Sequence, residues 1–177
     1  SDKYKKYFKG LYPNMVCKNG VAFKQLHLQN KIMINEIKSD KVLVLLSGTN
    51  AEIELMFELL NELKNNYQFI FRMHPMNRFN VDKYYKKDNY EIENEMSLDS
   101  LTQKVSKVIS TYSAVAVETA LSGLNIGFVY NKKELLINPF DDTGIENFQL
   151  ISQSSELEDF LKEKFNISEN KQIFNID

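Results

Sequence analysis

The chain has 177 residues, of which 43% are hydrophobic and 26% are charged, and its 22 basic and 24 acidic side chains leave a formal net charge of −2. This composition is typical of a globular protein that can bury a core, and it excludes the recruitment of nucleic acid by overall charge. Any anion site must therefore be local. Cys17 is the only cysteine, which excludes an internal disulfide and a metal site built from several thiolates of this chain.

Residues 1–40 are predicted to form an N-terminal amphipathic helix and a linker. Aromatic and leucine side chains recur at helical spacing over residues 4–12, with lysines between them, and Pro13 ends the pattern. Such a face more often packs on its own domain, and docking on a partner or a membrane is the alternative. His27 has no partner motif, and we assign it no chemistry.

Residues 41–177 show strand patterns alternating with helix patterns. Short apolar or alternating runs predict strands at 42–46, 67–73, 90–93, 107–109, 125–130 and 148–151. Helical patterns are found at 51–64, 97–105, 113–122 and 155–165. Ser155 and Glu158 are predicted to form a capping box at the start of the last helix. Gly123 is predicted to end the helix at 113–122. The polar segments 77–89 and 131–147 are expected to be surface connections. This alternation predicts an α/β fold, a Rossmann-like three-layer sandwich with a mostly parallel sheet.

Ligands of such sheets lie at the carboxyl ends of the strands, and three segments reach this edge. The turn Ser47-Gly48-Thr49-Asn50 offers a glycine for close backbone approach and polar side chains at a helix start, although it lacks the lysine of a phosphate loop. In His74-Pro75, a histidine fixed by the following proline can donate to a phosphate or take a proton. In Thr111-Tyr112-Ser113, hydroxyls and a helix N-terminus can bind an anion, with Glu118 one turn further along. Each segment also has a plainer explanation, namely a helix cap or a strand-ending proline beside an incidental histidine.

Taken together, these segments resemble the C-terminal, donor-binding half of GT-B glycosyltransferases. The resemblance rests on Phe71-Arg-Met-His-Pro75, on Ser110-Thr-Tyr-Ser113 with Glu118, and on Asn125-Ile-Gly-Phe-Val-Tyr-Asn131. It extends over about residues 41 to 165 and is strongest to bacterial surface-polysaccharide transferases of the sialyltransferase-like, Kdo-transferase-like and CDP-glycerol-transferase-like kinds.

The resemblance implies a nucleotide-sugar donor as substrate, linked to CMP, CDP or UDP, and no cofactor or metal. The His-Pro pair and the hydroxyl-rich turn would hold the donor phosphate, and Glu118 would contact the ribose. His74 would be the catalytic residue, because it would stabilise the leaving phosphate in place of a metal. Besides His74, the residues implied in donor binding are Ser47, Gly48, Thr49, Asn50, Pro75, Thr111, Tyr112, Ser113 and Glu118. Asp141-Asp142 lacks further acidic partners and is interpreted as a turn.

The GT-B fold has a second domain that binds the acceptor, and this chain is too short to hold both. Because the chain also lacks an initiator methionine, we expect it to be part of a longer protein, with residues 41–177 as the donor domain and little activity alone. The expected acceptor is a surface glycan such as capsule or lipooligosaccharide, and the expected location is the cytoplasm, with membrane contact through residues 3–12 as an option. A nucleotide-sugar 2-epimerase half-domain and a non-enzymatic module docking through residues 4–12 are the alternatives.

Overall fold

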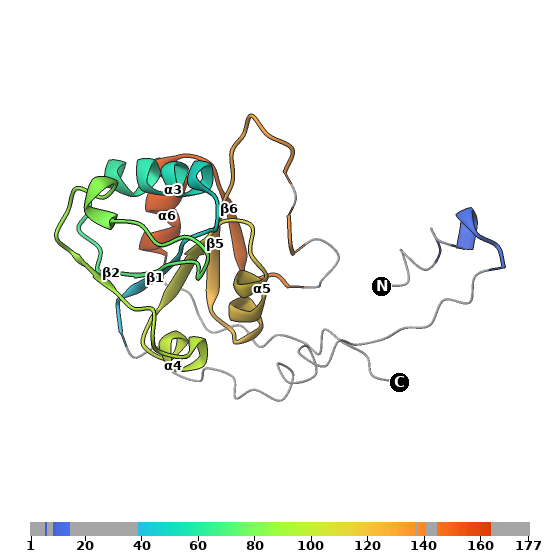
Figure 1. Cartoon of the computed structure of the whole chain (residues 1–177), viewed down its shortest axis with the longest axis horizontal. Helices are drawn as coiled ribbons and strands as arrows, with labels where there is room; N and C mark the ends of the chain where they lie inside the picture. Colours follow the sequence, from blue (N-terminus) through green and yellow to red (C-terminus); the bar gives the residue numbers. More distant parts are fainter. Residues whose placement is uncertain (1–5, 7–8, 15–38, 137, 141–144, 164–177) are drawn as a thin grey trace.

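The computed structural model describes residues 6, 9–14, 39–136, 138–140 and 145–163 (Figure 1). Residues 4, 5, 7 and 8 of the predicted helix lie outside the described residues, whereas residues 6 and 9–11 are helical. Residues 15–38 of the predicted linker, with Cys17 and His27, and Asp141-Asp142 also lie outside the described residues. No helix in the described part of the chain has the length and apolar character needed to cross a membrane.

One parallel sheet of six strands organises the domain, in the order β3-β2-β1-β4-β5-β6. The strands are β1 (Val42–Leu45), β2 (Phe69–Arg72), β3 (Tyr90–Ile92), β4 (Lys107–Ser110), β5 (Asn125–Val129) and β6 (Phe148–Ile151). All six predicted strands are therefore confirmed, and the sheet is parallel throughout. This is the strand order of dinucleotide-binding Rossmann folds, in which the chain reverses direction across the sheet between β1 and β4.

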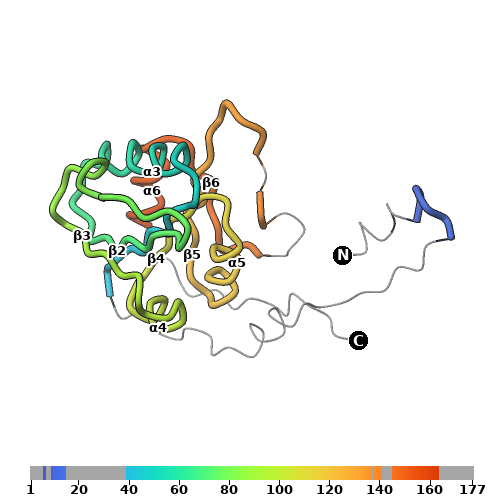
Figure 2. The backbone as a smooth tube through the Cα atoms, viewed as in Figure 1, coloured from blue at the N-terminus to red at the C-terminus, as the bar shows by residue number. Residues whose placement is uncertain are grey.

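Helices cover both faces of the sheet, as Figures 1 and 2 show. They are α3 (Asn50–Glu62), α4 (Leu98–Thr102), α5 (Ala114–Leu121) and α6 (Ser154–Lys162), with a 3-10 turn η1 (Val81–Lys83). Alternate residues of β1 point to opposite faces, so Val44 packs in the core below α3 and α6, whereas Leu43 packs in the core with α4 and α5. The three-layer α/β sandwich is thus confirmed.

The predicted end of α5 at Gly123 is confirmed, whereas the predicted surface position of residues 77–89 holds only in part. Gly123 has φ 92° directly after α5, which is the left-handed conformation that ends helices. The segment 77–89 is not wholly a surface connection, because Val81 and Tyr85 are buried and the Tyr85 ring meets Phe71 edge-on at 5.3 Å. An aromatic cluster therefore anchors this segment to the sheet.

The predicted capping box of α6 is wrong. Gln153 occupies the N-cap position, and Glu158 is buried at the end of α3, where it accepts hydrogen bonds from the backbone N–H of Lys64 (3.1 Å) and the hydroxyl of Tyr67 (3.1 Å). A third bond comes from the Asn65 amide. Burial raises the pKa of Glu158, but these hydrogen bonds lower it by more. The pKa of Glu158 therefore lies below its ordinary value of 4.5. Glu158 therefore ties α6 to α3 instead of capping its own helix.

Candidate functional site

The turn after β1 lies at the crevice edge of the sheet and leads into α3. The hydroxyl of Ser47 accepts a hydrogen bond from the N–H of Thr49 at 3.1 Å and can donate to its carbonyl at the same distance, so Ser47 holds the turn. Thr49 is the N-cap residue, but its side chain caps no N–H and donates instead to the Glu52 carboxylate at 2.6 Å. The N–H groups that open α3 are therefore not covered by the cap side chain, and the positive end of the helix dipole faces this edge.

His74 lies directly beside this turn. Its exposed imidazole is so close to Gly48 that a Cβ atom at residue 48 would come within 3.3 Å of Nδ1. Asn77 joins the two segments, because its amide donates to the Gly48 carbonyl at 3.2 Å and to the Asn50 side chain at 3.1 Å. The structure thus brings together two of the three segments expected from the sequence.

The backbone around His74 determines which ring nitrogen carries hydrogen. Residues His74 to Asn77 form a β-turn closed by a 3.0 Å backbone hydrogen bond, with Pro75 in its second position. Within this turn the N–H of Met76 donates to Nδ1 of His74 at 3.2 Å. In the neutral ring, Nδ1 therefore keeps its lone pair and Nε2 carries the hydrogen. The exposed side of the ring is a hydrogen-bond donor.

The third segment follows β4 and enters α5. Ser113 is the N-cap of α5, and its hydroxyl accepts from the N–H of Val115 at 3.2 Å, so the plainer explanation of this residue is confirmed. Its O–H hydrogen can still be donated outward. Tyr112 is 58% exposed, whereas Thr111 is 2% exposed and its Oγ1 has no hydrogen-bond partner among the described residues. Glu118 lies further along α5 and is half-buried.

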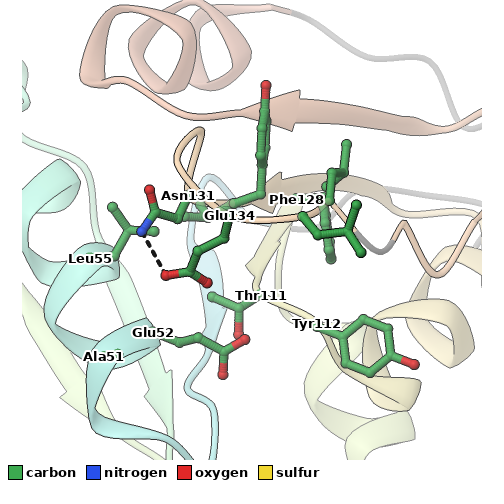
Figure 3. A pocket seen from close by; sticks show the side chains of 12 residues that line it. Ala51, Glu52, Leu55, Thr111, Tyr112, Phe128, Asn131 and Glu134 are labelled. Carbon is green, nitrogen blue, oxygen red and sulfur yellow. Dashed lines mark hydrogen bonds between the residues drawn. The ribbon is translucent and has the colours of Figure 1, made fainter.

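A pocket of about 270 Å³ opens between α3, the turn after β4 and the segment after β5 (Figure 3). Of the residues predicted from the sequence, Thr111 and Tyr112 line it, and the other eight do not. The sequence prediction missed the rest of the wall, which includes Glu52, Asn131 and Glu134. Asn131 and Glu134 follow a parallel strand, so the rule that ligands lie at strand carboxyl ends, applied also to β5, could have found them.

The described residues contain no group of three or more histidine, cysteine, aspartate or glutamate side chains placed to hold a metal ion. Positive charge at this edge comes from backbone N–H groups and the α3 dipole, with the His74 N–H beside them.

Comparison with known families gives a match to the middle of the chain. The model of the CDP-Glycerol:Poly(glycerophosphate) glycerophosphotransferase family matches residues 45–122, a little under half of the chain. Comparison with curated proteins gives no match. The matched segment runs from the last residue of β1 to the end of α5 and contains every site residue predicted from the sequence. The match supports a glycosyltransferase-like domain with transferase activity.

Proposed function

We propose that this domain binds the nucleotide-activated donor of a surface-polymer transferase and is the donor half of a GT-B-type enzyme. The observation that carries the proposal is the family match to residues 45–122, because that segment contains the Gly48 turn, His74 and the turn before α5. These elements follow three neighbouring strands in the order β2, β1 and β4, and so share one edge of the sheet.

The donor phosphates lie at the exposed side of the His74 ring, next to the Gly48 turn on which the ring packs. Gly48 has no side chain to hold the His74 ring away from the turn, and the opening N–H groups of α3 supply donors and a positive dipole end. Nε2–H of His74 adds a donor whose direction is set by the Met76 contact. Because these groups are fixed before the donor binds, they stabilise negative charge without reorganising.

The same arrangement supports either kind of transfer. If an acceptor hydroxyl attacks a sugar carbon, the bond from that carbon to the diphosphate oxygen breaks and a nucleoside diphosphate leaves. If it attacks the outer phosphorus, the bond to the bridging oxygen breaks and a nucleoside monophosphate leaves. In both cases the bonding pair goes to a phosphate oxygen, and His74 donates a hydrogen bond to the charge that develops there.

The matching family's description favours a cytidine diphosphate donor, and CDP-glycerol is the first compound to test. The remaining assignments follow the sequence resemblance: Ser113 donates its hydroxyl hydrogen to a phosphate, and Glu118 accepts from the ribose. A second domain binds the acceptor, and the reaction takes place in the cytoplasm.

Calorimetric titration of the chain with CDP-glycerol, CDP, CMP and UDP tests the proposal. We expect binding of at least one cytidine nucleotide, and we expect His74→Ala to weaken it about tenfold or more, the usual effect of removing a hydrogen bond to a charged group. Gln103→Ala is the control, because this exposed residue lies just before β4 at the opposite edge of the sheet. Absence of binding by all four compounds at millimolar concentration would overturn the proposal.

A further inference from the structure

Asn77 contacts both sides of the proposed phosphate site. The residue is half-buried, and its NH2 group makes two hydrogen bonds: Nδ2 donates to the carbonyl of Gly48 at 3.2 Å and to Oδ1 of Asn50 at 3.1 Å. Its backbone N–H donates to the carbonyl of His74 at 3.0 Å. One residue therefore joins the end of β2 to the turn after β1 and to the first residue of α3.

The side chain of Asn77 has the donors that this place requires. The two groups that it meets are both oxygens, the carbonyl of Gly48 and Oδ1 of Asn50. An amide NH2 group offers two hydrogens without adding a charge, whereas a hydroxyl could donate to one of these oxygens and a carboxylate to neither. Both contacts therefore depend on the amide of Asn77.

The contact with Gly48 holds the His74 ring in place. The ring packs on Gly48, with Nδ1 3.3 Å from the position that a Cβ atom at residue 48 would occupy, although His74 itself is exposed. Exposed side chains ordinarily change rotamer within nanoseconds. Because Asn77 bonds to the backbone of His74 and to that of Gly48, the ring and the turn keep their relative position.

The contact with Asn50 orients a second donor. Asn50 is exposed and opens α3, where the cap side chain covers no N–H group. Because Oδ1 of Asn50 accepts from Asn77, the NH2 group of Asn50 remains as a donor, and it makes no hydrogen bond with the described residues. In the opposite orientation of this amide, an oxygen would take the place of the NH2 group and repel a phosphate.

We propose that Asn77 is a positioning residue of the donor site, which holds the His74 ring against the turn after β1 and orients the Asn50 amide so that its NH2 group donates to the same phosphate. The inference rests on the proposed function, since that function places the donor phosphate at His74. Asn77 does not touch the phosphate in this arrangement. Its substitution therefore weakens binding through His74 and Asn50.

A double-mutant cycle measured by calorimetry tests this role, with CDP as ligand, or with CDP-glycerol where CDP alone binds too weakly. We expect Asn77→Ala to weaken binding about fivefold in the wild type. In the His74→Ala background we expect a loss of about twofold or less, because the ring that Asn77 holds is then missing. A merely structural loss would be the same in both backgrounds.

Asn61→Ala is the matched control. Asn61 also bridges two segments, since it donates to the Tyr84 carbonyl at 2.7 Å and accepts from the N–H of Lys86 at 3.0 Å. It lies at the other end of α3, away from the turn after β1. We therefore expect Asn61→Ala to leave the affinity unchanged.

The free protein gives a second readout that needs no ligand. His74 is one of two histidines in the chain, so its ring NMR signals can be assigned by comparison with His74→Ala. We expect Asn77→Ala to shift these signals and Asn61→Ala to leave them in place, with thermal unfolding as the check that the variants fold. Asn77→Asp keeps the shape of the side chain and donates neither bond, and it repeats the measurement if Asn77→Ala does not fold.

The outcomes separate the two proposals. If no cytidine nucleotide binds, the proposed function fails and the role of Asn77 falls with it. If a nucleotide binds but Asn77→Ala costs nothing, or costs the same factor with and without the His74 ring, the role of Asn77 alone is overturned. Unchanged ring signals in Asn77→Ala would also overturn it, because the ring would then be held without Asn77.

Discussion

The imidazole of His74 packs against the backbone of Gly48, with Nδ1 3.3 Å from the position that a Cβ atom at residue 48 would occupy. This distance is shorter than most contacts that real Cβ atoms make. The contact joins the turn after β1 to the end of β2, and Asn77 fastens it by bonding to the Gly48 carbonyl. Gly48 therefore sets both the room for a phosphate and the position of the ring that would bind it.

Gly48→Ala is expected to weaken nucleotide binding about tenfold while leaving the fold intact. The added methyl group moves the His74 ring by a few tenths of an ångström and narrows the approach to the backbone, and small displacements at such sites reduce binding strongly. Calorimetry with CDP-glycerol measures the loss, and thermal unfolding checks the fold. Gly10→Ala is the control, because a Cβ atom there meets nothing within 4 Å. Unchanged affinity in Gly48→Ala would remove Gly48 from the site.

Thr111→Val is expected to stabilise the protein. Valine has nearly the shape of threonine, and it removes a buried hydroxyl that has no partner among the described residues. The expected gain in the free energy of unfolding is about 1 kcal/mol, measured by urea denaturation. A loss of stability would show that the hydroxyl has a structural partner.

The sheet could be predicted from the sequence because its strands are buried on both faces and appear as short apolar runs such as Val42–Leu45. The order of the strands could not be predicted, because the hydrophobic pattern does not tell which strands are neighbours. The contact of His74 with Gly48 depends on that order, since it requires β2 to lie beside β1. Glu134 was missed for another reason. It lies in a polar connection without periodicity, and only its position after β5 gives it a place in the pocket wall.

Lys107 predicts an unusual pH dependence of stability. This buried side chain begins β4 and donates to the carbonyls of Phe160, Leu161 and Glu163 at the end of α6, at 2.7, 2.5 and 2.6 Å. Burial lowers its pKa from 10.5 to about 8, against the opposing effect of the Glu163 charge. Between these two values the unfolded chain binds more protons at this residue than the folded chain does, so its contribution makes unfolding less favourable as the pH rises.

We therefore expect the difference in unfolding free energy between the wild type and Lys107→Met to grow from pH 8 to pH 10 in favour of the wild type. Urea denaturation at half-unit pH steps measures it, and comparison with the variant cancels groups that titrate in both proteins. The window ends at pH 10, just below the ordinary lysine pKa of 10.5. A difference that stays constant from pH 8 to pH 10 would show that Lys107 keeps its ordinary pKa.

Glu158→Gln is expected to destabilise the protein by about 1–3 kcal/mol. The glutamine amide would point N–H groups at hydrogen-bond donors that pair with the Glu158 carboxylate in the wild type.

The lowered pKa of Glu158 also predicts how this difference changes in acid. A carboxylate whose folded pKa lies below its ordinary value of 4.5 contributes stability that is present above that value and is lost as the pH falls through the folded pKa. The wild type should therefore lose its advantage over Glu158→Gln below pH 4.5, as measured by urea denaturation from pH 7 to pH 3. Asp159→Asn, at an exposed position of the same helix, should change stability little at any pH. Equal stability of Glu158→Gln and the wild type at pH 7 would show that α3 and α6 are held together by apolar packing alone.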